Sequence, residues 1–347
     1  MNPFLSKRLC LARTPTQIIR LDRLSKQLNR EIYVWRDDLT GFVESGNKVR
    51  KLEFLFADAI EKQCNAIVTC GGIQSNHTRT ATAIAKRLGF EITIVVSGQC
   101  EQDPSSYPST ANLLLNQIFG ATIRFIETKN HEKAGDQFDL FLKAEADRLT
   151  QEGKRPYIIP LGGSNTIGCL GYLSATNEML KLWNETAPQS SGPDSVFCAV
   201  GSGATYAGLF LGLRHFQHPQ TRVYGVSASN TKHYFESVIT QLMRDASQRF
   251  LINLEDNFQK EVCVFDQYVG KGYEIATDDD LKFYLELART EGILLDPCYT
   301  GKAFQGMISE LKKFPLKYGK NILFLHSGGL FSTFAYQNQY SRVLNVS

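Results

Sequence analysis

The sequence lacks the cysteine spacings that mark metal or redox sites. Its eight cysteines are scattered over 347 residues, and no two of them form a CxxC pair. Most lie in apolar runs, where a cysteine is usually a buried, reduced thiol. We therefore expect no disulfide framework and no metal site, and the free thiols indicate a reducing compartment such as the cytoplasm.

The sequence also lacks long apolar runs and a strong excess of charge. No segment approaches the ~20 apolar residues needed to span a bilayer, and residues 1–21 lack the apolar core of a signal peptide. Early arginines without early acids leave a transit peptide as an alternative for that segment. The formal net charge is only +3 and no basic stripe is interleaved with aromatics, so we expect neither a membrane nor a nucleic-acid partner.

Short apolar runs alternate with longer amphipathic ones over most of the chain. We predict strands at 66–70, 91–98, 121–127, 156–163, 195–203, 222–229 and 322–329. Helical patterns follow the first four strands, near 76–88, 109–119, 132–152 and 168–187. This alternation predicts an α/β protein with open, twisted, mainly parallel sheets flanked by helices, and the length favours two domains.

Four of the predicted strands end in turns rich in glycine and in polar side chains. These turns read CGGIQSNH, LGGSNTIG, GSGATYAG and HSGG. Ligands of open α/β sheets bind beyond the carboxyl ends of the strands. We therefore expect the four turns to face one crevice and to form a binding site.

The turn AVGSGATYAG at 199–208 is a candidate phosphate site. Its glycines let the backbone approach an anion, with a helix N-terminus behind them. No GK[ST] ends the turn, and the GxGxxG spacing of dinucleotide sites is absent. A tight turn without a ligand is the alternative. The amides that we expect to bind the phosphate are those of Gly201, Ser202, Gly203, Ala204 and Thr205.

The turn CGGIQSNHTRTA at 70–81 has the same position between a strand and a helix. Ser75 and Asn76 are good N-cap residues, and free amides at a helix start bind a carboxylate. Simple helix capping is the alternative, although this turn is more polar than a cap requires. His77 alone is weak support, because a single histidine is more often structural.

The stretch GNKVRKLEF at 46–54 contains a candidate nucleophile. A lysine that forms a covalent imine must lose its proton near neutral pH, and both desolvation and a neighbouring cation lower its pKa. Lys51 precedes apolar Leu52 and Phe54 and follows Lys48 and Arg50. A solvated helix start is the alternative. Together with a phosphate site and no redox or zinc motif, this pattern indicates a phosphate-bearing aldehyde cofactor.

Six motifs occur in order across nearly the whole chain, namely GNKVRKLE, GGIQSNHTR, IPLGGSNTIGCLGY, AVGSGAT, KGYE and GILLDPCYTGKA. In these motifs the chain resembles the pyridoxal-phosphate enzymes D-cysteine desulfhydrase and 1-aminocyclopropane-1-carboxylate deaminase. The resemblance implies the tryptophan-synthase-β-like fold, which is pyridoxal-phosphate fold type II. It also implies a homodimer, a large domain of residues 1–51 and 171–347, and an inserted small domain of residues 52–170.

The resemblance assigns roles to residues around the cofactor, pyridoxal 5'-phosphate. Lys51 would bind it covalently, and Asn76 would bond to its ring hydroxyl. Tyr273 and Tyr299 would project toward the substrate, while Ser75 would contact the substrate carboxylate or act near the reacting carbon. The expected substrate contacts are Ser75, Asn76, His77, Gly163, Ser164 and Ser327.

The two activities within this family differ at two positions, and the chain has hydroxyl residues at both. Thr300 stands where the deaminases have glutamate, and Ser327 stands where they have leucine. A carboxylate would keep the pyridine nitrogen of the cofactor protonated and the electron sink strong, whereas a neutral hydroxyl does less. Opening a cyclopropane needs more help than expelling a thiolate, so these residues favour elimination. The chain departs from the family pattern at Glu274, which follows Tyr273 where the family usually has glycine.

We therefore predict a carbon–sulfur lyase that converts D-cysteine into pyruvate, ammonia and hydrogen sulfide. Lys51 is the first candidate for removal of the α-proton, with Tyr273 or Ser75 as alternatives. Cyclopropane deamination to 2-oxobutyrate and ammonia is the alternative activity. A relative that binds the cofactor without catalysis, and an interaction protein without a cofactor, are alternatives from other functional classes.

Overall fold

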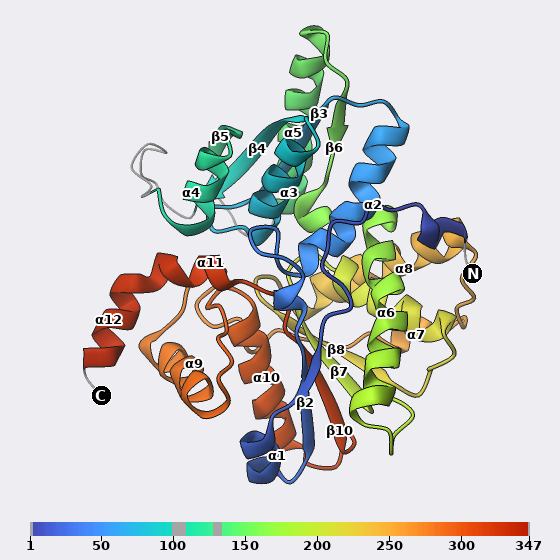
Figure 1. The fold of residues 1–347 in the computed structure, drawn as a ribbon, viewed down its shortest axis with the longest axis vertical. Coiled ribbons are helices and arrows are strands. Elements are labelled where there is room, and N and C mark those ends of the chain that lie inside the picture. The colour runs from blue at the N-terminus through green and yellow to red at the C-terminus, as the bar shows by residue number, and fades with distance from the viewer. Residues whose placement is uncertain (1–2, 99–108, 128–133, 346–347) are drawn as a thin grey trace.

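The computed structural model describes residues 3–98, 109–127 and 134–345. They form two sheets that lie one above the other in Figure 1. The larger sheet consists of β1 (Ile18–Arg20), β2 (Glu31–Trp35), β7 (Ser195–Val200), β8 (Arg222–Ser227), β9 (Val264–Phe265) and β10 (Asn321–Leu325). The smaller sheet consists of β3 (Ala66–Gly72), β4 (Glu91–Gly98), β5 (Thr122–Glu127) and β6 (Pro156–Ile158).

The strand pairing is mainly parallel, as predicted. The larger sheet has the order β1-β2-β10-β7-β8-β9, and the smaller has the order β5-β4-β3-β6. Among these described strands, only β1 and β2 pair antiparallel. The predicted fold class, two mainly parallel sheets flanked by helices, is confirmed.

Helices connect the strands and cover both sheets (Figure 1). The first six α-helices are α1 (Asp22–Leu28), α2 (Asn47–Glu61), α3 (Asn76–Arg87), α4 (Ala111–Ile118), α5 (Ala134–Gln151) and α6 (Thr166–Thr186). The others are α7 (Ala204–His215), α8 (Lys232–Phe250), α9 (Asp278–Glu291), α10 (Thr300–Lys313), α11 (Leu330–Thr333) and α12 (Gln337–Asn345). Short 3-10 helices are η1 (Pro3–Ser6), η2 (Asp37–Leu39), η5 (Leu161–Gly163), η6 (Phe258–Glu261) and η7 (Phe334–Tyr336).

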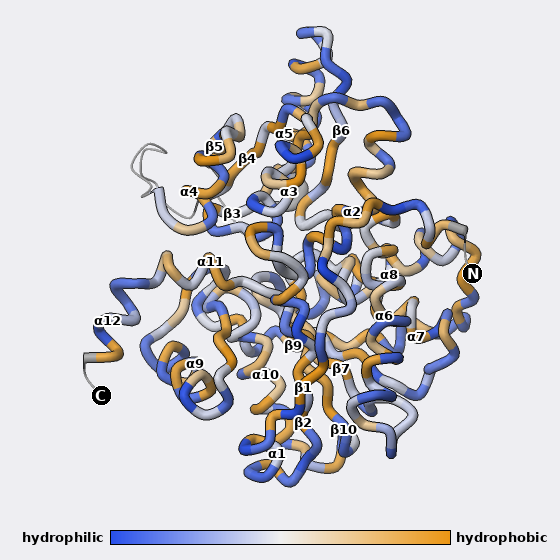
Figure 2. Tube along the Cα trace, viewed as in Figure 1, coloured by the Kyte–Doolittle hydropathy of each residue, from blue (hydrophilic) through white to orange (hydrophobic). Residues whose placement is uncertain are grey.

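The small sheet is covered on both faces because the side chains of its strands alternate. Along β3, Ala66, Val68 and Cys70 join one hydrophobic cluster with Phe138 of α5. Ile67 joins the larger cluster, to which α2 and α3 contribute. Successive side chains of a strand point to opposite faces, so β3 has apolar side chains on both faces, with Thr69 as its one polar side chain. Figure 2 shows hydrophobic residues gathered along the central strands of the fold.

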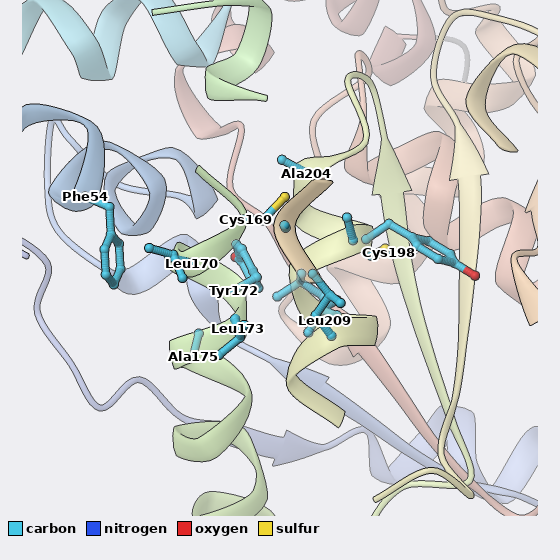
Figure 3. Close-up of a cluster of buried hydrophobic side chains, with 14 of the residues drawn as sticks. Phe54, Cys169, Leu170, Tyr172, Leu173, Ala175, Cys198, Ala204 and Leu209 are labelled. Carbon is cyan, nitrogen blue, oxygen red and sulfur yellow. The ribbon is translucent and has the colours of Figure 1, made fainter. Parts of the chain in front are cut away.

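Glycines let α2, α6 and α7 approach one another closely. A Cβ added at Gly171 of α6 would lie 2.7 Å from the carbonyl oxygen of Arg50 in α2. A Cβ added at Gly208 of α7 would lie 2.5 Å from the carbonyl oxygen of Cys169. Figure 3 shows the buried apolar side chains of α6 and α7 around these contacts. The backbones therefore pack at distances that any side chain at positions 171 and 208 would prevent.

A buried ion-pair network fixes α2 below its first turn. Arg50 Nε donates to Asp37 Oδ2 at 2.7 Å, and Arg50 Nη2 donates to Glu178 Oε1 at 2.8 Å. Asp37 also accepts hydrogen bonds from Tyr172 and Thr16. Buried charges are tolerated when they are paired and hydrogen-bonded, so this network holds α2 and α6 to the β2 end of the larger sheet.

The predicted division into domains remains a prediction. The smaller sheet uses strands between residues 66 and 158 only. Both predicted boundaries, at 51/52 and 170/171, fall inside helices, namely α2 and α6. These two helices would therefore belong partly to each domain.

Some expected absences concern only the described residues. Across residues 3–98, 109–127 and 134–345, no helix combines the length and apolar character needed to cross a membrane. Within the same residues, no group of histidine, cysteine, aspartate and glutamate side chains has the composition and proximity of a metal site. The described cysteines are free thiols, and Cys100 lies outside the described residues.

Candidate functional site

A cavity of about 310 Å³ lies at the carboxyl ends of strands from both sheets. The turns after β3, β6, β7 and β10 all contribute to its wall. These are the four polar turns that the sequence placed at one crevice. Parallel strands bring the turns together because their carboxyl ends meet at the same edge.

The two lysines of the first turns of α2 have different positions relative to this cavity. Lys48 lies on the wall and is partly exposed. Lys51 lies behind the wall, with 1% of its surface exposed, and its Nζ donates to the Gly162 carbonyl oxygen at 3.3 Å. The cavity is therefore lined by Lys48, and Lys51, the residue predicted as the nucleophile, is buried against the wall residue Gly162.

Both amines have a lowered pKa. Burial lowers the pKa of Lys48 to about 8. Burial also lowers the pKa of Lys51 well below its ordinary value, and the charge of Lys48 lowers it further. Arg50 was expected to lower the pKa of Lys51 as well, but its guanidinium is paired with Asp37 and Glu178 and plays no such part.

The start of α2 is held against two of the cavity turns. The Asn47 amide donates to the Ser327 carbonyl oxygen at 2.9 Å, and Asn47 Nδ2 donates to Thr205 Oγ1 at 3.1 Å. Gly46 precedes the helix with a φ of 102°, which favours glycine. These contacts orient the first turn, so that Lys48 faces the cavity.

The turn after β7 has the free amides that a phosphate requires. Ser164 Oγ donates to Ser202 Oγ at 2.7 Å and accepts from the Ala204 amide at 3.2 Å. The amides without an acceptor among the described residues are those of Gly201, Ser202, Gly203 and Thr205. At the start of α7 these amides suit an anion. Of the five predicted phosphate ligands, Ala204 is thus already bonded and does not line the cavity.

Glycine keeps space open beside this turn. A Cβ added at Gly162, which has a φ of 63°, would lie 2.3 Å from Ser202 Oγ and 3.7 Å from Lys48 Nζ. The Lys48 amine and the phosphate turn are thus neighbours across Gly162. An amine, free amides and an open cradle together fit the aldehyde and the phosphate of pyridoxal 5'-phosphate.

The turn after β3 presents a second helix start to the cavity. Ser75 is the N-cap of α3, and its Oγ accepts from the Thr78 amide. Among the described residues, the amides of Asn76 and His77 have no acceptor. Asn76 Oδ1 accepts from Asn112 at 3.0 Å, which leaves its amino group to donate into the cavity. This start of α3 therefore offers donors for a carboxylate and for a ring oxygen.

His77 is a neutral histidine on the cavity wall. Burial and the charges of Lys48 and Lys51 lower its pKa well below the ordinary value. Its Nε2 is 2.9 Å from Thr69 Oγ1, which itself donates to the Ile159 carbonyl oxygen. His77 Nε2 is therefore the donor of that bond. Its Nδ1 is a buried acceptor without a partner in the described part of the chain.

Two tyrosines and a glutamate meet on the cavity wall, where Tyr273 lies beside Gly72 and Tyr299 beside Gly201. The hydroxyls of Tyr273 and Tyr299 are hydrogen-bonded to each other. Burial raises the pKa of both phenols well above the ordinary value. Glu274 also lines the cavity, and its Oε1 accepts from the Gln74 amide at 2.9 Å. Burial raises the pKa of Glu274 to about 7.

Thr300 is tied to a carboxylate that the sequence analysis did not single out. Thr300 Oγ1 donates to Asp296 Oδ1 at 2.6 Å and accepts from the Asp296 amide at 2.9 Å. The two Asp296 carboxylate oxygens also accept from the Cys298, Tyr299 and Thr300 amides. Asp296 lines the cavity, whereas Thr300 is fully buried beside it. The Thr300 hydroxyl proton is therefore used in the hydrogen bond to Asp296.

Most of the predicted site residues share this cavity. Those on its wall are Ser75, Asn76, His77, Ser164, Gly201, Ser202, Gly203, Thr205, Tyr273, Tyr299 and Ser327. Lys51, Gly163, Ala204 and Thr300 lie behind it; a Cβ added at Gly163 would meet Leu55 at 3.1 Å. Sequence reasoning missed Lys48, Gly162 and Asp296 as wall residues. The sequence could have indicated Lys48, since it is the first basic residue of the stretch that contains Lys51.

Known proteins resemble this chain along nearly its whole length. The pyridoxal-phosphate dependent enzyme family matches residues 9–328. A Thermotoga maritima protein with the provisional name 1-aminocyclopropane-1-carboxylate deaminase is 36% identical over 329 residues, which are 94% of this chain and 98% of that protein.

Solved structures agree with this relationship. The crystal structure of an ACC deaminase homologue matches with a TM-score of 0.85 and 32% identity, covering 99% of this chain and 100% of that one. An L-serine ammonia-lyase from Rhizomucor miehei matches with a TM-score of 0.65 over 96% of this chain and 99% of its own, but at 14% identity it shares only the fold. The chain therefore belongs to the pyridoxal-phosphate-dependent enzymes, and within them to the type formed by 1-aminocyclopropane-1-carboxylate deaminase and D-cysteine desulfhydrase.

Proposed function

We propose that the protein is a D-cysteine desulfhydrase, which eliminates hydrogen sulfide from D-cysteine and yields pyruvate and ammonia. The observation that carries this proposal is the neutral side chain at position 300. Thr300 Oγ1 donates to Asp296 and carries no charge, so it does not supply the carboxylate that a glutamate at this position would offer to the ring nitrogen. Asp296 is occupied by its own donors. Such surroundings support a moderate electron sink, which suffices to expel sulfide from a β-carbon.

The residues of the cavity divide the remaining work. When bound, pyridoxal phosphate supplies the aldehyde that holds the substrate amine and the ring that accepts electrons. The free amides of Gly201, Ser202, Gly203 and Thr205 would hold the phosphate, and the Asn76 amino group would hold the ring oxygen. Lys48, rather than Lys51, is the amine that we propose to bind the cofactor, because Lys48 lines the cavity.

The substrate is held at the start of α3 and faces the tyrosine pair. Its carboxylate accepts from the Asn76 and His77 amides, next to the Ser75 hydroxyl. Lys48 Nζ, with a pKa of about 8, is suited to remove the α-proton once the substrate has taken its place. Tyr299 or Tyr273 then gives a proton to the departing sulfur. Ser164 and Ser327 complete the wall.

Deamination of 1-aminocyclopropane-1-carboxylate is the second candidate function. It is supported by the names of the Thermotoga maritima relative and of the crystallised homologue, which share 36% and 32% identity with this chain. Both reactions use the same cofactor and similar proton transfers. They differ in products, because ring opening gives 2-oxobutyrate and no sulfide.

A substrate panel on the purified yellow protein separates the two functions. D-cysteine, L-cysteine and 1-aminocyclopropane-1-carboxylate are each assayed for sulfide, ammonia and keto acid. We expect sulfide and pyruvate from D-cysteine at a kcat/KM at least about tenfold above that for the other two. Turnover of the cyclopropane acid in preference to D-cysteine would replace this proposal by the second one. A homodimer and a cytoplasmic location also remain proposals, and light scattering tests the first.

A further inference from the structure

Glu274 occupies a backbone conformation that favours glycine. Its φ is 58°, in the left-handed region that side chains with a Cβ rarely adopt. Such a conformation persists only where the surroundings fix it. Here Tyr336 donates to the Glu274 carbonyl oxygen at 2.6 Å, and Lys302 Nζ donates to the carbonyl oxygens of Val269 and Gly272 just before it. The loop is thus held so that the Glu274 side chain enters the cavity.

The Glu274 carboxyl group lies between the turn before α3, where we propose that the substrate carboxylate binds, and the hydroxyls of Tyr273 and Tyr299. Its Oε1 accepts from the Gln74 amide at 2.9 Å, next to the start of α3. It is also hydrogen-bonded to Tyr273, whose hydroxyl bonds to that of Tyr299. A Cβ added at Gly72 would lie 2.8 Å from Glu274 Oε1 and 2.6 Å from the Tyr273 ring. Glu274, Tyr273 and Tyr299 therefore form one hydrogen-bonded chain along the cavity wall.

The ionisable groups around Glu274 leave its carboxyl group poised near neutral pH. Burial raises its pKa to about 7, against the lowering effects of the Gln74 amide, Tyr273 and the Lys302 charge. Titratable groups that interact with it from the packed elements are Tyr273, Cys298, Tyr299, Lys302 and Tyr336. Lys302 is the cation among them, and its ammonium group donates to two backbone carbonyl oxygens rather than to Glu274. Near neutral pH the Glu274 carboxyl group can therefore both hold a proton and release it.

We propose that Glu274 supplies, through Tyr273 and Tyr299, the proton that the departing β-substituent takes up. This inference rests on the elimination proposed above. The Cβ–S bond breaks with its electron pair on sulfur, and the sulfur takes the Tyr299 hydroxyl proton. Tyr299 takes the Tyr273 proton, and Tyr273 takes that of the Glu274 carboxyl group. Glu274 remains as a carboxylate and is reprotonated by water in the cavity. It acts through the tyrosines and is a positioning residue for this proton.

The test compares leaving groups that differ in their need for a proton. Sulfide leaves D-cysteine more readily when protonated, whereas chloride leaves 3-chloro-D-alanine as a stable anion. In the holoprotein, Glu274→Gln keeps the size of the side chain and an acceptor for the Gln74 amide. We expect kcat for D-cysteine to fall about tenfold and kcat for 3-chloro-D-alanine to change less than about twofold. Glu185→Gln, at an exposed position, is the matched control.

The pH profile is the second readout. For the native protein, kcat with D-cysteine should fall as the pH rises through about 7, because Glu274 loses its proton there. In Glu274→Gln this fall should disappear. Equal losses with both substrates would show a structural role only, and an unchanged pH profile would also overturn the proposal.

An infrared difference spectrum separates this inference from the proposed function. The spectrum of native holoprotein minus Glu274→Gln should contain a protonated-carboxyl band at about pH 6 that fades through about pH 7. Absence of turnover with either substrate would refute the elimination, whatever the band. Absence of the band would refute the proton supply by Glu274, whatever the substrate.

Discussion

Arg50 and Asp37 form a two-point ion pair beneath the first turns of α2. Arg50 Nε and Nη2 donate to the two Asp37 oxygens at 2.7 and 2.8 Å, and neither side chain is more than 1% exposed. The pair lies one residue from Lys51 and two from Lys48. It therefore couples the stability of the fold to the position of the cavity amine.

Removal of one member of this pair should be costly. In Asp37→Ala the buried guanidinium keeps only Glu178 as a counter-charge, and we expect the free energy of unfolding to fall by about 3–5 kcal/mol. Asp22→Ala removes an exposed partner of Arg20 and should cost about 1 kcal/mol or less. Urea unfolding measures both. A similar small loss in the two variants would contradict the role given to the Arg50 network.

The identity of the cofactor lysine can be read directly. After borohydride reduction of the holoprotein, peptide mapping should place the label on Lys48, because that amine reaches the cavity. Lys51→Met preserves most of the buried volume and should keep the label, whereas Lys48→Ala should lose it together with the absorbance of the bound cofactor. A label on Lys51 would refute this proposal and confirm the assignment made from the sequence.

The open cradle beside the phosphate turn should be sensitive to one methyl group. In Gly162→Ala the new Cβ would lie 2.3 Å from Ser202 Oγ, so the turn must shift and its amides would no longer point toward the phosphate. We expect the affinity for pyridoxal phosphate to fall at least about tenfold, a loss of ~1.4 kcal/mol. Gly153→Ala is the control, since its φ of 79° carries similar strain but no atom lies within 4 Å of the new Cβ. Equal affinities in the two variants would show that the cradle is not used.

Glu274 should make stability depend on pH. Its pKa is raised from 4.5 in the unfolded chain to about 7 in the folded one, so the folded state holds the proton more tightly. The resulting stability is fully present below pH 4.5 and is lost as the pH rises through 7. Relative to Glu274→Gln, the native holoprotein should therefore lose about 2–3 kcal/mol of unfolding free energy between pH 5 and pH 8. Urea unfolding at both pH values checks this, and a constant difference would refute the raised pKa.

The sequence predicted the turns of the site better than the side chains that enter the cavity. Each turn follows an apolar strand and carries its own signal, because glycine and N-cap residues act locally. Strands β1, β2 and β9 were not predicted; β1 and β9 have only three and two residues. They depend on neighbouring strands rather than on a local pattern.

The proposal of Lys48 beside the predicted Lys51 came from the tertiary structure. Both residues lie on α2, three positions apart, and both have a lowered pKa. The contact of Asn47 with Ser327 holds the first residues of α2, which include Lys48, beside the cavity. A contact over such a distance in the chain leaves no trace in a local motif. The burial of Glu274 and Asp296 likewise depends on packing between distant segments.

Gly171 lies outside the cavity, yet a natural substitution at this position would inactivate the protein. Its lack of a side chain permits the backbone of α6 to touch that of α2 at Arg50. A substitution there would spread the two helices and carry the amine of Lys48 out of reach, while every residue lining the cavity stayed the same. Homologous chains with an intact set of cavity residues but a larger residue at this position should therefore be suspected of having lost catalysis.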